Sequence, residues 1–221
     1  ELGSALGSID RAIGNEPIEP RFYGLKGDIY LKKREYSKAN GFYDKALNLD
    51  PEYYEYYLGR GLSLAKLGRS EAARQDLERS NELLPTAIAM NQLGQLSLSR
   101  GDHKSAKAYF QSAMTAGGDT GQEATAAFTQ LDLPENPGRY LRAEVYGEEG
   151  RLIANIENLT GLLIREFEIT FYATVNGDEV RRTVTSGRLN ARQHGRVNSG
   201  LRFKSADVVE SVYARVTAAS L

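Results

Sequence analysis

A pattern of small and large residues recurs about every 34 residues through the first half of this 221-residue chain. Prolines at positions 17, 51 and 85 mark the same spacing. This period is typical of helical repeat arrays, in which each short unit stacks on the next. The repeat therefore predicts a helical solenoid. The recurring positions are Gly27, Ala39, Tyr43, Ala46 and Pro51, then Gly61, Ala73, Leu77, Ser80 and Pro85, then Gly94, Ala106, Phe110, Ala113 and Gly118.

The pattern resembles the tetratricopeptide repeat (TPR). The resemblance implies pairs of antiparallel helices, with a small residue where two helices cross and a bulky residue filling the gap between them. In all three copies the small residue of the first helix precedes the Ala of the second by 12 positions. The chain departs from the family at Lys26 and Arg60, where Leu is usual, and at Tyr23 and Tyr57, where Trp is usual.

The residues before Pro17 fit the second helix of a further copy whose first helix is missing. Ala5, Ile9 and Ala12 supply its small and apolar positions, and the chain begins with Glu1. Each repeat of a solenoid buries its apolar face only against a neighbour, so a terminal repeat normally carries a polar cap. We therefore expect the sequence to be a fragment, with more protein upstream.

The helical period ends at a breaker that contains Pro134, Asn136, Pro137 and Gly138. Beyond it the period becomes alternating. This predicts two domains: a TPR solenoid over 1–133, with a partial repeat, three full repeats and a capping helix, and a β-domain over 139–221. The expected helices are 2–13, 20–33, 36–49, 54–67, 70–83, 87–100 and 103–116, with the capping helix at 122–131.

The second domain alternates apolar and polar residues, as in a sheet with one buried and one wet face. Phe167, Ile169 and Phe171 lie on one face, and Asn176-Gly177 is a two-residue hairpin turn. About six or seven short strands predict a small antiparallel β-sandwich, with a half-open barrel as the alternative. The domain resembles an immunoglobulin- or fibronectin-type module, although the chain has no Cys and no Trp. The fold class is multidomain, α plus all-β.

Composition argues against several functions. The net charge is −1, and the pI near 6.3 is far below the value of about 9 that is usual for nucleic-acid-binding domains. No apolar run approaches the roughly 20 residues of a transmembrane helix. The two histidines, His103 and His194, lie in different predicted domains. No zinc, phosphate-loop or nucleophile-elbow motif is present. We therefore predict no catalytic residue, no metal and no cofactor in this chain.

Two local patterns leave alternatives open. The cluster Tyr53, Tyr54, Tyr56 and Tyr57 is the densest aromatic feature. Tyr57 falls on the large-residue position and is expected in the core, whereas the other three lie near a helix start with rings partly exposed. Tyrosine is common in recognition surfaces, so packing and binding are both open. Asn158-Leu159-Thr160 matches a glycosylation sequon, a pattern with many false matches.

The first helix of each repeat lines the inner surface of an array of this type. Side chains of both charges are expected there, which suits a peptide ligand, although a merely solvated helix face is the alternative. The predicted groove residues are Arg21, Asp28, Leu31, Lys32, Glu55, Leu62, Lys66, Asn91, Gln95 and Leu98.

Some TPR domains hold the carboxyl tail of large chaperones with a clamp of Lys, Asn and Arg side chains. The clamp positions here carry Gly24, Asp28, Gly59, Ile88 and Gln92. A carboxylate at position 28 would repel a terminal carboxylate. The sequence therefore argues against binding of chaperone tails.

The leading hypothesis is a noncatalytic scaffold that binds a partner protein or peptide in the TPR groove. The order of repeats and β-domain also resembles the C-terminal region of TPR-containing bacterial zinc metallopeptidases. That resemblance implies a regulatory or substrate-recruiting region, with the catalytic domain outside this chain, and favours the bacterial periplasm or cell envelope. A third hypothesis is carbohydrate binding by the β-domain through Tyr140, Tyr146, Tyr172 and Tyr213. Oligomeric state and partner identity stay open.

Overall fold

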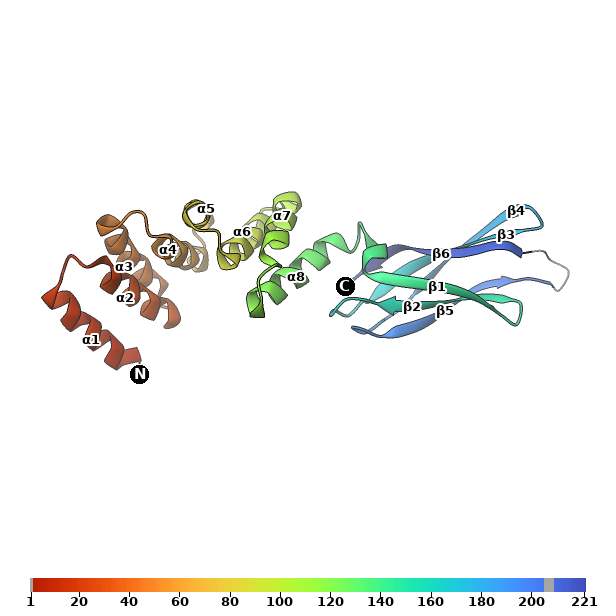
Figure 1. Ribbon diagram of the computed structural model, residues 1–221, viewed down its shortest axis with the longest axis horizontal. Coiled ribbons are helices and arrows are strands. Elements are labelled where there is room, and N and C mark those ends of the chain that lie inside the picture. The colour runs from red at the N-terminus through yellow and green to blue at the C-terminus, as the bar shows by residue number, and fades with distance from the viewer. Residues whose placement is uncertain (1, 205–208) are drawn as a thin grey trace. The chain divides into compact units, whose positions relative to one another are not determined.

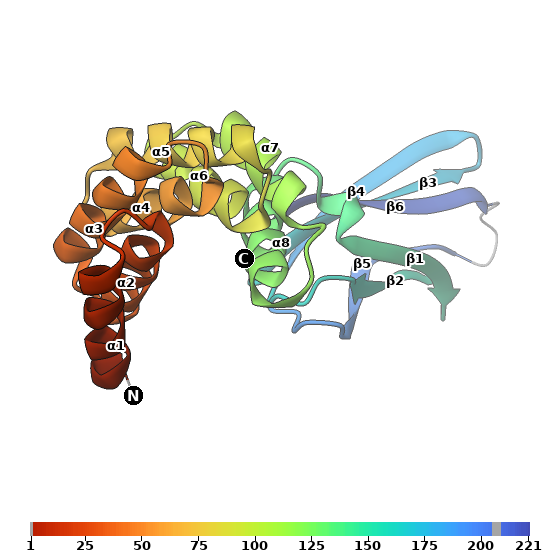
Figure 2. The same ribbon diagram turned by 60° about the vertical axis from the view of Figure 1, so that its left-hand side comes forward.

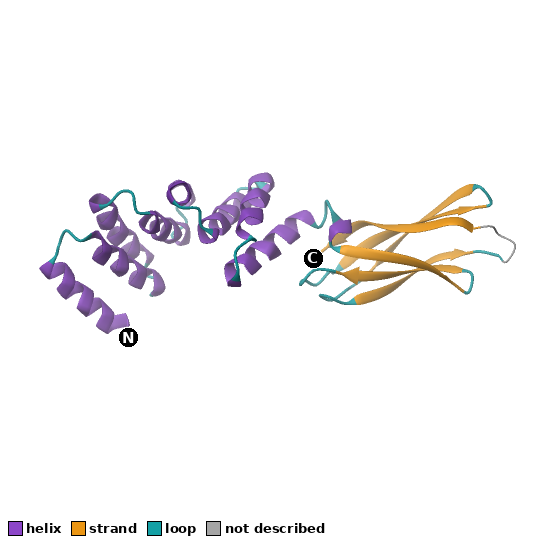
Figure 3. Cartoon of the chain, viewed as in Figure 1, coloured by secondary structure: helices purple, strands orange, loops and turns teal. Residues whose placement is uncertain are grey.

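A computed structural model describes residues 2–204 and 209–221. The chain divides into two compact units, one up to Thr125 and the other from Ala126 onward. Helices form the first unit and strands dominate the second (Figures 1 and 3). The helices are α1 (Leu2–Asn15), α2 (Pro20–Lys32), α3 (Tyr36–Leu49), α4 (Tyr54–Lys66), α5 (Ser70–Leu83), α6 (Ala87–Ser99), α7 (His103–Ala113) and α8 (Gly118–Asp132).

Successive helices pack as antiparallel pairs that stack along the chain (Figure 2). The pairs are α2 with α3, α4 with α5, and α6 with α7, and α3 and α5 also contact the first helix of the next pair. The first helices lie side by side, since α4 contacts both α2 and α6. This arrangement confirms the predicted TPR-type solenoid.

The repeated small and large residues make the contacts that the pattern predicts. A Cβ atom at Gly27 would lie 2.7 Å from a ring carbon of Tyr43, which is 1% exposed. The same approach recurs in the later repeats with Leu77 or Phe110 in place of tyrosine. Glycine is required there because the second helix presses its bulky side chain onto the backbone of the first. The three pairs are Gly27 with Tyr43, Gly61 with Leu77, and Gly94 with Phe110.

The turns inside the three repeats share one backbone geometry. Arg34, Gly68 and Gly101 have φ angles of 61°, 74° and 76°. This left-handed conformation ends a helix and costs glycine least. Arg34 adopts it as well, so the first repeat keeps the turn despite its poorer capping residue.

Tyrosine replaces the family's usual tryptophan in two repeats and makes a repeated hydrogen bond. The Tyr23 hydroxyl donates to the Pro17 carbonyl oxygen at 2.9 Å, and the Tyr57 hydroxyl donates to that of Pro51 at 3.0 Å. Each bond ties a first helix to the proline that closes the preceding unit. Tyr57 is therefore only half-buried, whereas Tyr56 is 4% exposed and lies in the core. Tyr57 packs against the core as predicted without being fully buried, and the prediction that Tyr56 is partly exposed was wrong.

Arg60 stands where the family usually has leucine, and it links three helices. Its Nη1 donates to Asp44 of α3 at 2.7 Å, and its Nε and Nη2 donate to Asp76 of α5, each at 2.7 Å. These hydrogen bonds, chiefly those to Asp76, raise the pKa of Arg60. One repeat earlier, Lys26 of α2 pairs with Asp10 of α1. The two departures from the family are therefore ion pairs between neighbouring helices.

We expect Arg60→Leu to lower the free energy of unfolding by about 2 kcal/mol, because it leaves the buried Asp76 carboxylate without its charged donor. Arg79→Leu is the matched control, since Arg79 pairs with Glu82 at the surface and such pairs contribute about 0–1 kcal/mol. Urea unfolding read by helical circular dichroism checks the prediction. Equal midpoints for the two variants would show that the link through Arg60 is not stabilising.

The second unit is a sandwich of two three-stranded antiparallel sheets. One sheet has the order β1-β2-β5 and the other β4-β3-β6. Two sheets with a shared core agree with the predicted sandwich rather than with a half-open barrel. The strands are β1 (Leu141–Glu148), β2 (Arg151–Asn158), β3 (Glu166–Val175), β4 (Asp178–Ser186), β5 (His194–Arg202) and β6 (Val209–Ser220).

The alternation on β3 predicts the core correctly. Phe167, Ile169 and Phe171 are at most 2% exposed and pack against Leu152 and Ile156 of β2. Asn176 and Gly177, with φ angles of 52° and 86°, form the predicted turn between β3 and β4. The inward faces of the two central strands, β2 and β3, therefore lie at the centre of the core.

The helix α8 begins before its predicted start and extends the helical region to Asp132. Its last residues and Leu133, which is fully buried, belong with the second unit. The limits 1–133 and 139–221 stay a proposal for where the domains could be separated. Within the described residues, no helix is both long and apolar enough to cross a membrane.

Candidate functional site

All ten predicted groove residues lie on the first helices of the repeats. We call the surface formed by α2, α4 and α6 the first-helix surface. Residues at the same repeat position differ strongly in chemistry: Arg21, Glu55 and Ile88 form one such set. The helices carry Arg21, Asp28, Leu31 and Lys32 (α2), Glu55, Leu62 and Lys66 (α4), and Asn91, Gln95 and Leu98 (α6).

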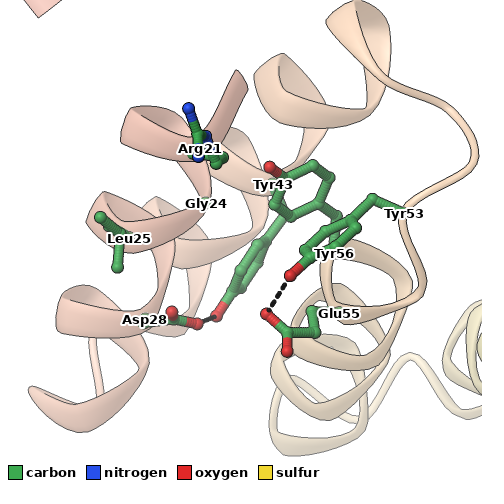
Figure 4. A pocket seen from close by; sticks show the side chains of 8 residues that line it. All are labelled: Arg21, Gly24, Leu25, Asp28, Tyr43, Tyr53, Glu55 and Tyr56. Carbon is green, nitrogen blue, oxygen red and sulfur yellow. Dashed lines mark hydrogen bonds between the residues drawn. The ribbon is translucent and has the colours of Figure 1, made fainter. Parts of the chain in front are cut away.

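A pocket of about 160 Å³ lies between the first two full repeats. It brings together three of the predicted residues, Arg21, Asp28 and Glu55 (Figure 4). The other five lining residues are Gly24 and Leu25 of α2, Tyr43 of α3, Tyr53, which precedes α4, and Tyr56 of α4.

The backbone of α2 forms one wall of the pocket because Gly24 has no side chain. A Cβ atom at this position would lie 2.4 Å from a ring carbon of Tyr56. Tyr43 is also in close contact with a second glycine, Gly59 of α4. The Tyr43 and Tyr56 rings therefore rest on helix backbone, and the Tyr43 hydroxyl reaches the Asp28 carboxylate.

Tyrosine hydroxyls hold both carboxylates of the pocket. Tyr43 donates to Asp28 Oδ1 at 2.7 Å, and Tyr53 donates to Glu55 Oε2 at 3.0 Å, as Figure 4 shows. Tyr54 donates to the second oxygen of Glu55 at 3.0 Å. These neutral donors orient the carboxylates without cancelling their charge.

The pKa shifts follow from burial and from these hydrogen bonds. Loss of hydration raises the pKa of Asp28, the Tyr43 hydrogen bond opposes that rise, and the charge of Glu55 adds to it. Burial raises the pKa of Tyr43 and raises that of Tyr56 to about 12. Near neutral pH the tyrosines are therefore protonated donors.

The remaining predicted residues do not share this pocket. Leu62 packs against the core cluster that contains Leu64 and Leu77. Asn91 donates from Nδ2 to Glu123 of α8 at 3.2 Å. The pocket thus occupies only the part of the predicted groove nearest the N-terminus.

Sequence reasoning missed the aromatic lining of the pocket. The repeat pattern predicts Tyr43 as a core residue, and it leaves both packing and binding open for Tyr53 and Tyr56. Tyr56 does both, because it is buried and also lines the pocket. The repeat spacing was the available signal, since it places Tyr43 one helix away from Gly24 and Gly27.

The chaperone-clamp positions carry no clamp chemistry here. Gly24 and Asp28 line the pocket, Gly59 packs on Tyr43, and Ile88 is 48% exposed on α6. The Asp28 carboxylate at the pocket would repel a terminal carboxylate.

His103 begins α7 and His194 begins β5, and both are exposed. Among the described residues, no group of three or more His, Cys, Asp or Glu side chains is placed to hold a metal ion. The metallopeptidase hypothesis concerns protein outside this chain and stays a hypothesis, as does the envelope localisation that it favours. Asn158 of the sequon is fully buried.

The β-domain tyrosines do not form one surface patch. Tyr172 and Tyr213 stack with ring centroids 4.6 Å apart on neighbouring strands. Tyr140 instead donates to Asp132 at 2.9 Å and is half-buried, and this environment raises its pKa to about 12. Tyr146 lies under the guanidinium of Arg196. Carbohydrate binding through all four residues stays a hypothesis without further support.

A stack of antiparallel helix pairs whose first helices lie side by side is a helical-repeat solenoid, a class that presents an extended binding surface. A model of the tetratricopeptide repeat matches residues 1–54, 26–85 and 58–119. The chain therefore belongs to the tetratricopeptide repeat family. Proteins of this family bind proteins or peptides.

Curated relatives share parts of the solenoid. The chain is 27% identical over 114 residues to anaphase-promoting complex subunit 3 of Schizosaccharomyces pombe, a match that covers 51% of this chain and 17% of the relative. It is 29% identical over 100 residues to the heat-shock protein cognate co-chaperone sgt12 of Aspergillus fumigatus, covering 45% and 29%. The matched segments thus span less than a third of these two relatives.

Solved structures support the solenoid fold. The TM-score to YrrB, described as a TPR protein with an unusual peptide-binding site, is 0.53 at 22% identity, covering 60% of this chain and 67% of YrrB. The crystal structure of MamA gives a TM-score of 0.50 at 19% identity, covering 59% and 86%. At these identities the likeness concerns the fold alone.

Proposed function

We propose that this chain is a noncatalytic interaction region whose first-helix surface binds an extended or helical segment of a protein partner. The observation that carries the proposal is the pocket between α2, α3 and α4. It lies on the surface that the predicted groove residues share, and it combines apolar area with oriented polar groups. That combination is usual for sites that recognise a ligand.

Exposed apolar side chains on the same surface support the proposal. Leu25 of α2 is 51% exposed and Ile88 of α6 is 48% exposed. A bound segment would remove this apolar area from water, which is the main favourable term in association. YrrB, which shares the fold, is itself described as having a peptide-binding site.

The test is selection of peptides from a random library on the purified chain, followed by affinity measurements on variants. We expect the double variant Leu25→Ala/Ile88→Ala to bind the selected peptides at least about tenfold more weakly. The reason is that the two truncated side chains lose more than about 1.4 kcal/mol of favourable apolar burial. The measurement is fluorescence anisotropy of the labelled peptides.

Leu49→Ala/Leu84→Ala is the matched control. These leucines are 43% and 46% exposed, and they lie at the ends of the second helices α3 and α5. We expect the control to bind within about twofold of the unchanged chain. If both double variants lost affinity equally, or if neither lost any, binding at the first-helix surface would be contradicted.

A further inference from the structure

The two carboxylates of the pocket differ from other acidic groups of the solenoid. Asp44 and Asp76 are paired with Arg60, and Glu78 is paired with Arg74. Asp28 and Glu55 instead accept hydrogen bonds from tyrosine hydroxyls. Their negative charge is therefore oriented but not neutralised by direct contact with a cation among the described residues.

The basic residue of the pocket does not supply the missing cation. Arg21 precedes Asp28 by two helical turns, and Figure 4 shows it at the other end of the pocket from Asp28 and Glu55. Its Nε donates to Glu19 Oε1 at 2.8 Å, so its own charge is already paired. Lys32 acts on Asp28 only through space. Two carboxylates against one paired arginine leave the pocket acidic.

The carboxylates also act on each other, because the charge of Glu55 raises the pKa of Asp28. A cation bound between them would relieve both this repulsion and the lost hydration of Asp28. A positive charge close to two such carboxylates favours the ionised form of both.

The walls of the pocket suit a cation that carries an apolar stem. Tyr53 and Tyr56 have ring centroids 4.7 Å apart at an interplanar angle of 57°. Faces of tyrosine rings attract ammonium and guanidinium groups. The exposed Leu25 side chain provides apolar surface for a methylene chain.

The pocket has the size of one side chain. Its volume of about 160 Å³ is close to that of a cavity of ~150 Å³ that holds a benzene molecule. It can therefore take the end of one long side chain but not a folded segment.

We infer that the pocket binds the side chain of a lysine or arginine in the partner segment, which it grips between the Asp28 and Glu55 carboxylates and the tyrosine rings. This inference rests on the proposed function and adds the chemistry of the anchor. A terminal carboxylate in the pocket would be repelled by the two carboxylates. The preferred ligand is therefore positively charged, whereas a chaperone tail ends in a negative charge.

The probes are N-acetyl-arginine amide, N-acetyl-lysine amide and N-acetyl-citrulline amide, titrated into the full ¹⁵N-labelled chain. Citrulline has nearly the shape of arginine without its charge. We expect the arginine and lysine amides to shift the backbone amide signals of Gly24 and Glu55, with citrulline amide binding at least about tenfold more weakly. Equal binding of the citrulline and arginine amides would overturn the inference.

The matched variants are Asp28→Asn/Glu55→Gln and Asp119→Asn/Glu179→Gln. Both remove two negative charges, but Asp119 and Glu179 are exposed and lie outside the pocket. We expect the first variant to weaken the arginine amide at least about tenfold and the second to change binding less than about twofold. Retained binding by the first variant would contradict the inference. Its amide groups still accept from tyrosine, so the pocket keeps its shape.

The inference and the proposed function can fail separately. Selected peptides could depend on Leu25 and Ile88 but bind equally well after their own Lys or Arg residues are replaced by uncharged ones. This result would support binding at the first-helix surface and contradict the cation anchor. The opposite result is that arginine amide binds at Gly24, but no selected peptide loses affinity in the Leu25→Ala/Ile88→Ala variant. This result would support the cation pocket and contradict the proposed function.

Discussion

Replacement of Asn158 by aspartate is expected to unfold the β-domain at far lower urea concentration than any surface change. Asn158 is fully buried at the end of β2. Its Nδ2 lies 2.8, 3.2 and 3.0 Å from the carbonyl oxygens of Leu162, Leu189 and Asn190. Its Oδ1 accepts from the Thr160 backbone N–H at 2.9 Å and from the Thr160 hydroxyl at 2.8 Å.

Aspartate keeps the shape of asparagine but replaces the donor by a second acceptor. Three carbonyl oxygens would then face a buried carboxylate, so the group must either stay charged without a partner or take up a proton. We expect a loss of about 3–5 kcal/mol, because each unsatisfied buried group costs about 1–3 kcal/mol. At a urea dependence of about 1–2 kcal/mol/M, the midpoint should fall by about 1.5 M or more.

The control is Asn155→Asp on the same strand, where the side chain is exposed and the change should stay within about 0.5 kcal/mol. Hydrogen–deuterium exchange across a urea series reads the two units separately, through peptides from the strands and from the helices. Strand peptides that lose protection at the same urea concentration in both variants would contradict the prediction. A variant that never protects the strands but keeps the helices protected would agree with it.

Gly59→Ala is expected to destabilise the first two full repeats by up to about 2 kcal/mol, which is the usual overpacking cost of about 1–3 kcal/mol less the helix-propensity gain of alanine. A Cβ atom there would lie 2.3 Å from Tyr43 Cζ. The ring cannot move away easily, since it is 1% exposed, rests on Gly27 on another side and is hydrogen-bonded to Asp28. The overpacking therefore outweighs the helix-propensity gain of alanine, which is about 1 kcal/mol.

Gly41→Ala is the control with the opposite sign. Gly41 lies in α3, and nothing stands within 4 Å of the Cβ atom it would gain. The stability should therefore rise by about 0.5–1 kcal/mol. Exchange of peptides from α2, α3 and α4 in urea measures both variants. Stabilisation by Gly59→Ala would refute the close contact.

A double variant tests the cause of the Gly59 effect. The second repeat carries Leu77 where the first has Tyr43, so leucine fits this kind of site. Gly59→Ala combined with Tyr43→Leu should cost less than the sum of the two single changes, because the alanine methyl group then occupies space that the ring has left. Strict additivity would mean that the glycine and the ring do not interact.

Several features of the fold could be predicted because they depend on local pattern. The repeat of Gly, Ala and a bulky residue predicted the helix pairs, and the alternation on β3 predicted the buried face. Asn176-Gly177 predicted a turn that both residues enter with positive φ. In each case one residue type meets one backbone requirement, so a short stretch of sequence is sufficient.

The roles of individual aromatic and charged residues could not be predicted in the same way. Tyr56 is the buried ring of the cluster, whereas Tyr57 packs against the core half-buried and donates to the Pro51 carbonyl oxygen. Arg60 reads as a departure from the family until Asp44 and Asp76 are placed beside it. Both outcomes depend on partners that neighbouring helices bring close, and the repeat pattern does not specify those partners.

The sequence by itself determined the architecture of this protein, because the spacing of small and bulky residues permits one way of stacking helices and the alternation of polar and apolar residues permits one buried sheet face. The candidate groove could also be assigned to the first helices from this spacing. Only the tertiary structure decided that Asp28 and Glu55 meet at one pocket with Tyr43, Tyr53 and Tyr56. A pocket depends on the distances between side chains of different helices, and those distances are set by packing.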